Sequence, residues 1–386
     1  MNKKQELGIY IHIPFCAKKC YYCDFVSYPN MKEKQKEYVE ALKKEIKSYD
    51  LQNYNITTIY IGGGTPSYIE SKYIVDVLEY IKSKLNANET KFENMEITIE
   101  VNPGTVTKEK LLDYKKVGIN RLSIGLQSTN DRLLKQIGRI HKYQDFLQTY
   151  NLARNVGFTN INIDLMLGLP NQSIKDLKES IEKMISLQPE HISIYSLIVE
   201  EGTKLYKQIE TGELQLPEEE LERKMYWYTK SKLELAGYKH YEISNYAKPK
   251  RESKHNSNCW EQKQYIGIGA SAHSYLNNIR YCNVSNLKEY ISNMENVEAD
   301  FEEKYIVNER QNLEDRKNEF MLLGLRKIDG VSITMFKEKY VENPIFRYRD
   351  SLKKLVNEGL VLIDGDMIKL TNKGLDLANI VWEEFI

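Results

Sequence analysis

Three of the five cysteines lie close together near the N-terminus, in the order Cys16-Ala-Lys-Lys-Cys20-Tyr-Tyr-Cys23. Three thiolates on one loop can bind three irons of a cubane cluster, which leaves the fourth iron open to the amine and carboxylate of an amino acid. Structural zinc needs four ligands, and the other cysteines, Cys259 and Cys282, stand alone and far away. The spacing C-x3-C-x2-C therefore predicts a [4Fe–4S] cluster at Cys16, Cys20 and Cys23, with zinc as the less favoured alternative.

Glycine and acidic residues follow or end other apolar segments. The loop Gly62-Gly63-Gly64-Thr65-Pro66 follows the apolar residues 57–61. Its backbone N–H groups can face an anion without obstruction by side chains, although an ordinary tight turn between strand and helix has the same composition. Glu100 ends a second apolar segment, where a carboxylate is costly unless it has a partner. These residues are candidates for binding a ligand beside the cluster.

The candidates need a scaffold that brings them together. Short apolar segments predict strands over residues 8–13, 57–61, 96–101, 121–125, 160–166 and 191–197, and helical patterns such as residues 34–48 and 72–85 lie between them. Repeated strand–helix units imply a parallel sheet with right-handed crossovers, and six such units can form an open barrel. The active sites of αβ barrels form at the carboxyl ends of the strands, so we expect the candidate residues to meet on one rim.

The pattern changes after about residue 210. A helix is expected to run to Gly237, residues 240–283 look rich in loops, and the tail is mostly helical with a hairpin over residues 360–363 and 367–370 around Asp364-Gly365-Asp366. The predicted fold class is α/β: a partial (β/α)6 barrel over residues 1–240, a loop region with a connecting helix over residues 241–305, and a mostly helical, winged-helix-like domain over residues 306–386.

Composition excludes several classes of protein. Lys plus Arg and Asp plus Glu both total 55, and this balance argues against a general nucleic-acid binder, which needs a basic surplus. The mixed charge of the tail predicts a docking element rather than a reader of DNA. We find no signal peptide and no apolar run of about 20 residues, the length needed to span a bilayer. We therefore expect a cytoplasmic protein, whose thiols stay reduced and free to bind metal.

The cysteine loop resembles that of radical S-adenosylmethionine (radical SAM) enzymes. Its flanking sequence, Tyr10-Ile-His-Ile-Pro-Phe-Cys16, is similar to the anaerobic coproporphyrinogen III oxidase family and, within it, to the HemW-type heme chaperones, over nearly the whole chain. The resemblance implies that the reduced cluster passes one electron to bound S-adenosylmethionine. It further implies cofactor contacts at Tyr10, Tyr22, Gly63, Gly64, Thr65, Glu100, Gln127, Arg139 and Asp164. Without it, Arg139 would be interpreted as a solvated charge at a helix end, and Asp164 as a capping carboxylate.

Two departures separate the chaperone branch from the oxidase branch. Coproporphyrinogen oxidases tend to carry a fourth cysteine two residues after the third, where this chain has Phe25. They also carry a longer extension before the cluster, whereas fifteen residues precede Cys16 here. Both differences resemble the chaperones.

A second motif, His255-Asn256-Ser257-Asn258-Cys259-Trp260, resembles the His-Asn-x-x-Tyr-Trp motif of the chaperone branch, with Cys259 in place of tyrosine. The segment Gly267-Ile268-Gly269-Ala270 follows it, as in that branch. Histidine and thiolate both bind heme iron, and an aromatic ring can stack on a porphyrin. The hypothesis is that His255 is an axial heme ligand or lies against bound heme, with Cys259 as a second candidate contact. The alternative is a polar loop with a hydrogen-bonded histidine.

The leading interpretation is a heme chaperone that binds heme and delivers it to apo heme proteins. Its cofactors would be a [4Fe–4S] cluster, S-adenosylmethionine and heme, and whether it is also an enzyme stays open. The alternative is an oxygen-independent coproporphyrinogen III oxidase, which decarboxylates two propionates to vinyl groups. A radical enzyme of another kind acting on tetrapyrroles, or an iron–sulfur barrel with an unrelated task, is less favoured. Transient contact with membrane proteins and a homodimer are further expectations, and nucleic acid is not expected as a partner.

Overall fold

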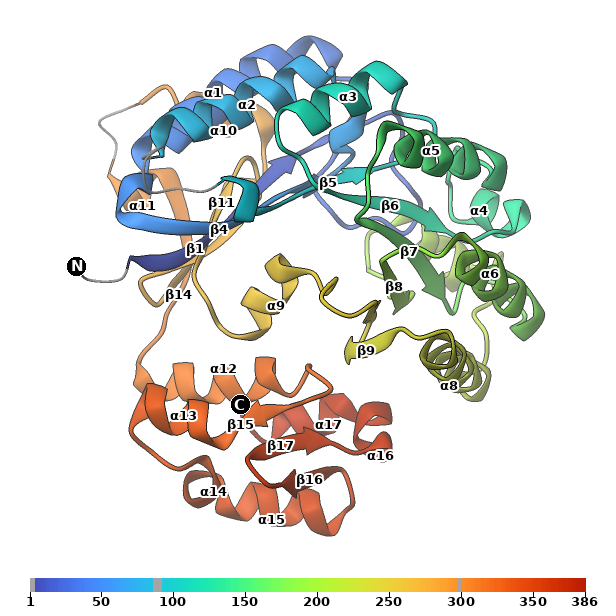
Figure 1. Cartoon of the computed structure of the whole chain (residues 1–386), viewed down its shortest axis with the longest axis vertical. Coiled ribbons are helices and arrows are strands. Elements are labelled where there is room, and N and C mark those ends of the chain that lie inside the picture. The colour runs from blue at the N-terminus through green and yellow to red at the C-terminus, as the bar shows by residue number, and fades with distance from the viewer. Residues whose placement is uncertain (1–3, 86–91, 297–299) are drawn as a thin grey trace.

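Six parallel strands form the centre of the molecule (Figure 1). They are neighbours in the order β1 (Gln5–Ile13), β4 (Tyr54–Gly63), β5 (Glu96–Val101), β6 (Arg121–Gln127), β7 (Ile161–Leu167) and β8 (His191–Ser196). The computed structural model describes residues 4–85, 92–296 and 300–386. All six predicted strands are present, which confirms the α/β barrel-like architecture.

Helices cover one face of this sheet. They are α1 (Gln35–Ser48), α2 (Ser71–Lys84), α3 (Lys108–Lys116), α4 (Asp131–Gln136), α5 (Tyr143–Val156), α6 (Ile174–Leu187), α7 (Lys204–Glu210) and α8 (Glu219–Leu235). Figure 1 shows α1, α2, α3, α5, α6 and α8 arranged in an arc outside the strands. The short pair β2 (Phe15–Cys16) and β3 (Tyr28–Pro29) begins and ends the cysteine loop.

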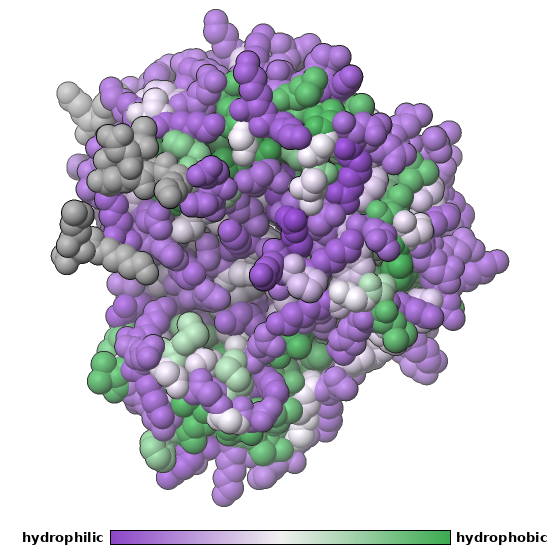
Figure 2. Space-filling model, in the orientation of Figure 1, coloured by the Kyte–Doolittle hydropathy of each residue, from purple (hydrophilic) through white to green (hydrophobic). Residues whose placement is uncertain are grey.

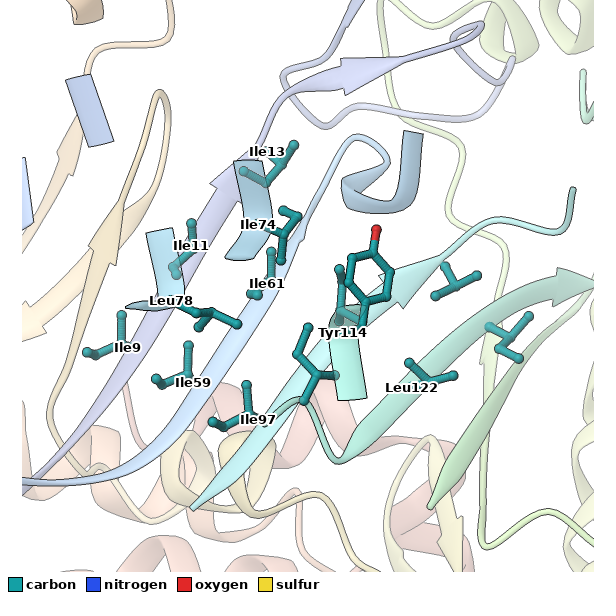
Figure 3. Close-up of a cluster of buried hydrophobic side chains, with 14 of the residues drawn as sticks. Ile9, Ile11, Ile13, Ile59, Ile61, Ile74, Leu78, Ile97, Tyr114 and Leu122 are labelled. Atoms are coloured by element: carbon teal, nitrogen blue, oxygen red, sulfur yellow. The ribbon is translucent and has the colours of Figure 1, made fainter. Parts of the chain in front are cut away.

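The two faces of the central strands differ in chemistry because successive side chains point to opposite sides. Toward the helices, Ile9, Ile11 and Ile13 of β1 pack with isoleucines of β4 and with Leu78 of α2 in one large apolar core. Figure 3 shows these side chains together with Tyr114 of α3. The opposite face carries polar side chains such as His12, and this polar interior is where the candidate residues lie.

The prediction that residues 240–283 are rich in loops is wrong. This region and the next contain β9 (Lys239–Glu242), β10 (Asn245–Ala247), α9 (Lys254–Trp260), β11 (Tyr265–Ile268), β12 (His273–Leu276), β13 (Ile279–Asn283), α10 (Leu287–Asn293), α11 (Phe301–Lys304) and β14 (Tyr305–Arg310). The strand β10 pairs with β8, and β11 pairs with β1, so the sheet is extended at both edges to twelve strands. These strands are only three to six residues long. Neighbouring strands form the pairs β9–β10, β11–β12 and β12–β13, whereas the pairs β10–β8 and β11–β1 join segments that are distant in sequence.

The C-terminal residues form a separate small core. Its elements are α12 (Leu313–Gly324), β15 (Val331–Ser332), α13 (Ile333–Tyr340), α14 (Pro344–Arg347), α15 (Arg349–Asn357), β16 (Val361–Asp364), β17 (Met367–Leu370), α16 (Asn372–Asp376) and α17 (Ala378–Glu383). The predicted hairpin is confirmed as β16–β17, and β15 joins it in a three-stranded sheet. Phe320, Phe336 and Leu355 are buried in this core. The exact domain boundaries stay a prediction.

Backbone hydrogen bonds join the C-terminal core to the barrel. Ile243 N donates to Arg326 O over 3.2 Å, and Ile328 N donates to Tyr241 O over 3.1 Å. Figure 1 shows α9 between the sheet and the C-terminal elements, and Figure 2 shows a mostly polar surface with apolar patches on those elements. No helix within the described residues is long and apolar enough to cross a membrane.

Candidate functional site

The cysteine loop lies at the carboxyl end of β1, and its three thiols line one cavity of about 150 Å³. Cys16 is buried, with its Sγ 3.4 Å from Thr65 Oγ1. Arg139 Nη1 donates to Cys20 Sγ over 3.6 Å, and the Cys23 thiol faces the same space. Tyr21 fixes the loop through its backbone, which donates to Ile137 O and accepts from Leu205 N. The predicted metal-binding cysteines are thus brought together around one space.

This arrangement fits a cubane cluster better than a single metal ion. Among the described residues, no three His, Cys, Asp or Glu side chains converge on one ion position. Each cysteine of a cubane binds a different iron, so three thiols spread around a cavity are what the cluster requires. Burial raises the pKa of the Cys16 thiol, and it raises that of Cys23 to about 11. The Cys23 thiol is therefore protonated without iron, and binding of iron there must release its proton.

The glycine loop packs directly against the cysteine loop. Gly63 has φ +115°, and a Cβ there would lie 2.6 Å from the His12 ring. A Cβ on Gly64 would lie 2.9 Å from Cys16 Sγ. Side chains are therefore excluded at both positions, by conformation at the first and by close approach at the second. This requirement goes beyond an ordinary turn and leaves the backbone of the loop facing the cysteine cavity.

Glu100 has the partners that its position demands. Tyr60 OH donates to its Oε1 over 3.0 Å, and Gly63 N donates to its Oε2 over 3.1 Å. Burial and, to a smaller extent, the negative charge of Asp164 raise the pKa of Glu100 to about 7. A carboxylate with this pKa can accept hydrogen bonds from the amine or hydroxyl groups of a cofactor and still exchange a proton near neutral pH.

The other cofactor candidates line the same cavity as Glu100 and the cysteines. Arg139 Nη2 donates to Asn102 Oδ1 over 2.8 Å and to Gly125 O over 2.6 Å, so the side chain is not a solvated charge at a helix end. Gln127 adopts φ +67°, which is costly for a non-glycine residue, and its Oε1 accepts from Tyr195 OH over 3.0 Å. These bonds hold both side chains in the cavity wall.

Asp164 also lines the cavity. It accepts a hydrogen bond from Asn162 Nδ2 over 2.6 Å and another from Ser123 Oγ over 3.2 Å. Burial raises its pKa. Its bonds go to side chains inside the barrel and not to the next turn of the chain, so Asp164 is not a simple capping carboxylate.

Tyr22 lines the cavity, whereas Tyr10 does not. The Tyr10 hydroxyl lies 3.0 Å from His12 Nδ1, and its ring stacks on Tyr60 with centroids 6.2 Å apart. His12 Nε2 bonds to Val26 O over 2.9 Å. Tyr10 therefore supports the site through His12, which braces the cysteine loop and fills the space beside Gly63. The inward direction of His12 could have been inferred from its position between the core residues Ile11 and Ile13, although its contact with Val26 could not.

A larger cavity of about 450 Å³ continues into the barrel from the cysteine site. It shares Tyr22, Cys23, Glu100 and Asp164 with the smaller cavity. Its lining also includes Phe25 and Ile198, which are 61% and 69% exposed and so mark the open side. Polar residues that were not predicted line the interior: Arg121, Ser123, Asn162, Ser193, Tyr195, Asn245 and Asn256. The alternation of Arg121 and Ser123 with Leu122 and Ile124 in β6 was the sequence signal for this inner face.

The second motif forms α9, and its residues point in different directions. The His255 ring is buried, with Nδ1 2.9 Å from Thr58 Oγ1 and the ring centroid 5.2 Å from that of Tyr60. Burial and, to a smaller extent, the positive charge of Arg121 lower the pKa of His255 to about 4, so the imidazole is neutral. A neutral imidazole is the form that binds metals. However, Asn256 lines the larger cavity and His255 does not.

The other two notable residues of α9 face away from the cavity. Burial raises the pKa of the Cys259 thiol to about 11, and the thiol lines neither cavity. The Trp260 ring lies 4.4 Å from the Arg326 guanidinium, whose opposite neighbour is Trp382 at 5.3 Å. The structure therefore does not bring Cys259 and Trp260 together with the cysteine site.

Comparisons with known proteins agree with this geometry. The family model of the radical SAM superfamily matches residues 10–184, and that of the HemN C-terminal domain matches residues 311–377. The chain is 39% identical over 379 residues to the heme chaperone HemW of Bacillus subtilis (strain 168), covering 98% of each chain. It is 36% identical over 377 residues to the heme chaperone HemW of Lactococcus lactis subsp. lactis, covering 98% of this chain and 96% of the relative.

Among solved structures, the coproporphyrinogen III oxidase HemN of Escherichia coli, described as a radical SAM enzyme, superposes with a TM-score of 0.84. The match covers 99% of this chain and 90% of that chain at 23% identity. Similarity at this level of identity shows that the two chains share a fold.

Proposed function

The chain belongs to the HemW heme chaperone family of the radical SAM superfamily, and from this premise we propose that it binds heme and delivers it to apo heme proteins. The observation that carries the proposal is similarity along 98% of both chains to a protein named as a heme chaperone. The chain also has Phe25 where the oxidases tend to carry a fourth cysteine, as the chaperones do.

The proposed cofactor site is the rim cavity. Cys16, Cys20 and Cys23 would hold the [4Fe–4S] cluster, and the cluster with S-adenosylmethionine supplies one-electron chemistry when both are bound. The residues proposed to contact S-adenosylmethionine are Gly63, Gly64, Thr65, Glu100, Gln127, Arg139, Asp164 and Tyr22, with Tyr10 acting through His12. Glu100 and Arg139 offer opposite charges across one cavity, which suits the charged amine and carboxylate of an amino acid.

The proposed heme site is the larger cavity. Its apolar open side at Phe25 and Ile198 suits a porphyrin face, and His255 lies just behind its wall with a neutral imidazole. The contact of Nδ1 with Thr58 Oγ1 is compatible with iron binding through Nε2, but axial ligation requires the ring to enter a cavity that it does not line.

Heme titration of the full chain with a reconstituted cluster tests this site. Replacing His255 with Ala is expected to weaken heme binding at least tenfold and to shift the Soret band, because an axial ligand or a packed wall is lost. His240→Gln is a matched control, because His240 is also buried, and burial lowers its pKa to about 4 as well. Unchanged heme affinity and an unchanged spectrum in His255→Ala would exclude His255 from the site.

The oxidase is the second candidate, because the fold of the Escherichia coli enzyme is shared over 99% of this chain. An anaerobic assay with reconstituted cluster, S-adenosylmethionine, a strong reductant and coproporphyrinogen III separates the two functions. The chaperone proposal expects no protoporphyrinogen. Stoichiometric protoporphyrinogen together with 5′-deoxyadenosine would establish the oxidase instead.

We also propose that the protein acts in the cytosol, where free thiols can load iron. Delivery requires contact with apo heme proteins, some of them in membranes, and a homodimer stays a prediction. Chemical crosslinking of the heme-loaded protein to an apo-cytochrome, with the heme-free protein as control, would test delivery.

A further inference from the structure

Arg121 is a buried cation inside the barrel that the cofactor site does not use. It is the first residue of β6, is 2% exposed, and lines the cavity of about 450 Å³. Its neighbours along the strand, Leu122 and Ile124, point the other way into the apolar core. Its guanidinium therefore points toward the interior of the barrel, below the cysteine rim.

This guanidinium lacks the partners that buried arginines normally have. Its Nε is buried without a hydrogen bond, and no residue in the described part of the chain forms an ion pair or hydrogen bond with it. An arginine cannot lose its charge to relieve burial. A buried charge without a partner is therefore costly, and such groups persist where function requires them.

The nearby carboxylates are already engaged elsewhere. Glu100 accepts from Tyr60 and Gly63, and Asp164 accepts from Asn162 and Ser123. Glu96, at the start of the neighbouring strand β5, accepts from the backbone N–H groups of Lys254 and His255. These acids balance the charge of Arg121 from a distance, but none of them fills its hydrogen-bonding positions.

We propose that Arg121 binds a carboxylate of the ligand that enters the larger cavity, and that this carboxylate is a propionate of a tetrapyrrole. The identity of the ligand rests on the proposed function, whereas the carboxylate site rests on Arg121 itself. The cavity is apolar in part at its open side, where Phe25 and Ile198 lie among the exposed Asp24 and Glu200, and polar inside, where Arg121 is the one cation among its described lining residues. An apolar ring with a carboxylate tail fits this gradient with the tail directed inward.

The carboxylate of S-adenosylmethionine is the other possible source, and the geometry disfavours it. Apart from Tyr10, the residues that resemble cofactor contacts line the smaller cavity with the cysteines, and only Tyr22, Glu100 and Asp164 of them also line the larger one. Of the two cavities, Arg121 lines the larger one alone. Arg139 already provides a guanidinium there.

The first test compares heme with heme dimethyl ester, in which both propionates are blocked, by titration into the full chain with a reconstituted cluster. The wild-type protein is expected to bind heme about 10- to 100-fold more tightly than the ester, as a charge-assisted hydrogen bond would provide. Arg121→Gln should lose most of this preference, and Arg121→Lys should retain part of it. Equal affinities of the wild-type protein for heme and ester would overturn the proposal.

S-adenosylmethionine binding provides the control. Equilibrium dialysis should give Arg121→Gln an affinity for S-adenosylmethionine within about twofold of the wild-type value, because Arg121 lies outside the cofactor cavity. A tenfold loss of that affinity would assign Arg121 to the cofactor and overturn the assignment to a propionate.

A second measurement does not depend on heme. Thermal unfolding of the cofactor-free Arg121→Met variant should occur at a midpoint a few degrees above that of the wild-type protein, because an unpaired buried charge is removed. A lower midpoint would mean that Arg121 is structural, and the proposal would fail. If the wild-type protein does not bind heme at all, the chaperone function fails, and this stability change alone decides whether Arg121 is an unfilled carboxylate site.

Discussion

The cysteine loop and α9 each carry a motif that stands out in the sequence. The fold brings the first motif together at one cavity and separates the residues of the second. The loop gathers Cys16, Cys20 and Cys23 around one cavity together with Glu100 and Arg139. The helix α9 distributes its motif over three environments: His255 against Thr58, Asn256 in the larger cavity, and Trp260 against Arg326.

The difference follows from backbone geometry. A loop between two short strands can direct three cysteines toward one cavity, whereas successive residues of a helix are separated by about 100° around its axis. His255 and Asn256 are adjacent and so must face different sides. A motif on a short helix can therefore contact several regions without forming one site. In α9 these regions are the barrel wall, the cavity and the C-terminal core.

The largest expected effect concerns the cysteine loop. Cys16→Ser should abolish the reconstituted cluster, because a buried thiolate ligand is lost, and iron content and the visible absorption should fall to background. Cys282→Ser is the matched control, since Cys282 is also buried but lies on β13. An equal loss of iron in the control would show that the assay follows general damage and not the loop.

The next largest expected effect is a loss of cofactor affinity when the glycine loop is changed. Gly63→Ala should lower the affinity for S-adenosylmethionine at least tenfold, because the added Cβ would lie 2.6 Å from the His12 ring. Gly104→Ala separates this clash from backbone strain: its φ is also positive, at +80°, but nothing lies within 4 Å of the added Cβ. Both variants should lose about 1 kcal/mol or more of stability from the strained φ. Similar binding losses in both would contradict the role of the close contact.

The next prediction concerns Trp260, the residue of the α9 motif that contacts the C-terminal core. Trp260→Ala should destabilise the docking of the C-terminal core by about 2 kcal/mol, since the cation–π contact with Arg326 is lost. Hydrogen exchange in α12 and α13 should become faster, while cluster loading stays unchanged. Trp382→Phe, on the other side of Arg326, should give a smaller effect in the same direction. A tenfold loss of heme affinity with unchanged exchange would place Trp260 in the heme site instead.

The smallest expected effect concerns stability and involves the segment Gly267-Ile268-Gly269-Ala270, which lines neither of the two cavities. Gly269 N donates to the buried Glu45 over 2.8 Å, and Asn283 and Tyr290 donate to the same carboxylate. Burial raises the pKa of Glu45 from 4.5 to about 7. The folded protein therefore retains a proton that the unfolded chain releases, and the free energy of unfolding falls as pH rises from about 4.5 to 7.

Glu45→Gln should flatten this slope, and denaturation with urea at several pH values measures it. Part of the slope should remain, because burial also raises the pKa of Glu100 to about 7. The exposed Glu220→Gln should leave the slope unchanged, since the pKa of Glu220 is lowered by its hydrogen bond with Lys224. An identical slope in Glu45→Gln and the wild-type protein would show that the Glu45 carboxyl titrates normally.

Much of the barrel could be predicted from the sequence. The predicted strands over residues 96–101 and 121–125 lie within β5 and β6, because short segments with apolar residues at alternating positions are a local signal. The strand predicted over residues 57–61 is shorter than the observed β4, which extends from Tyr54 to Gly63, because polar residues at its start and glycines at its end do not indicate a strand. The strands β9 to β13 were missed because each has only three to five residues, and because the pairing of β10 with β8 and of β11 with β1 depends on neighbours far away in the chain.

The cluster loop, the alternation of inward and outward residues, and the tight glycine loop could be predicted from the amino-acid sequence, because each depends on residues that are close together in the chain. Only the tertiary structure decided that Arg121 is buried without a partner, that Cys259 and Trp260 face away from the cavity, and that His12 braces the cysteine loop. The physical reason is that burial and pairing depend on strands and helices that are distant in sequence, and local periodicity carries no information on which of these meet.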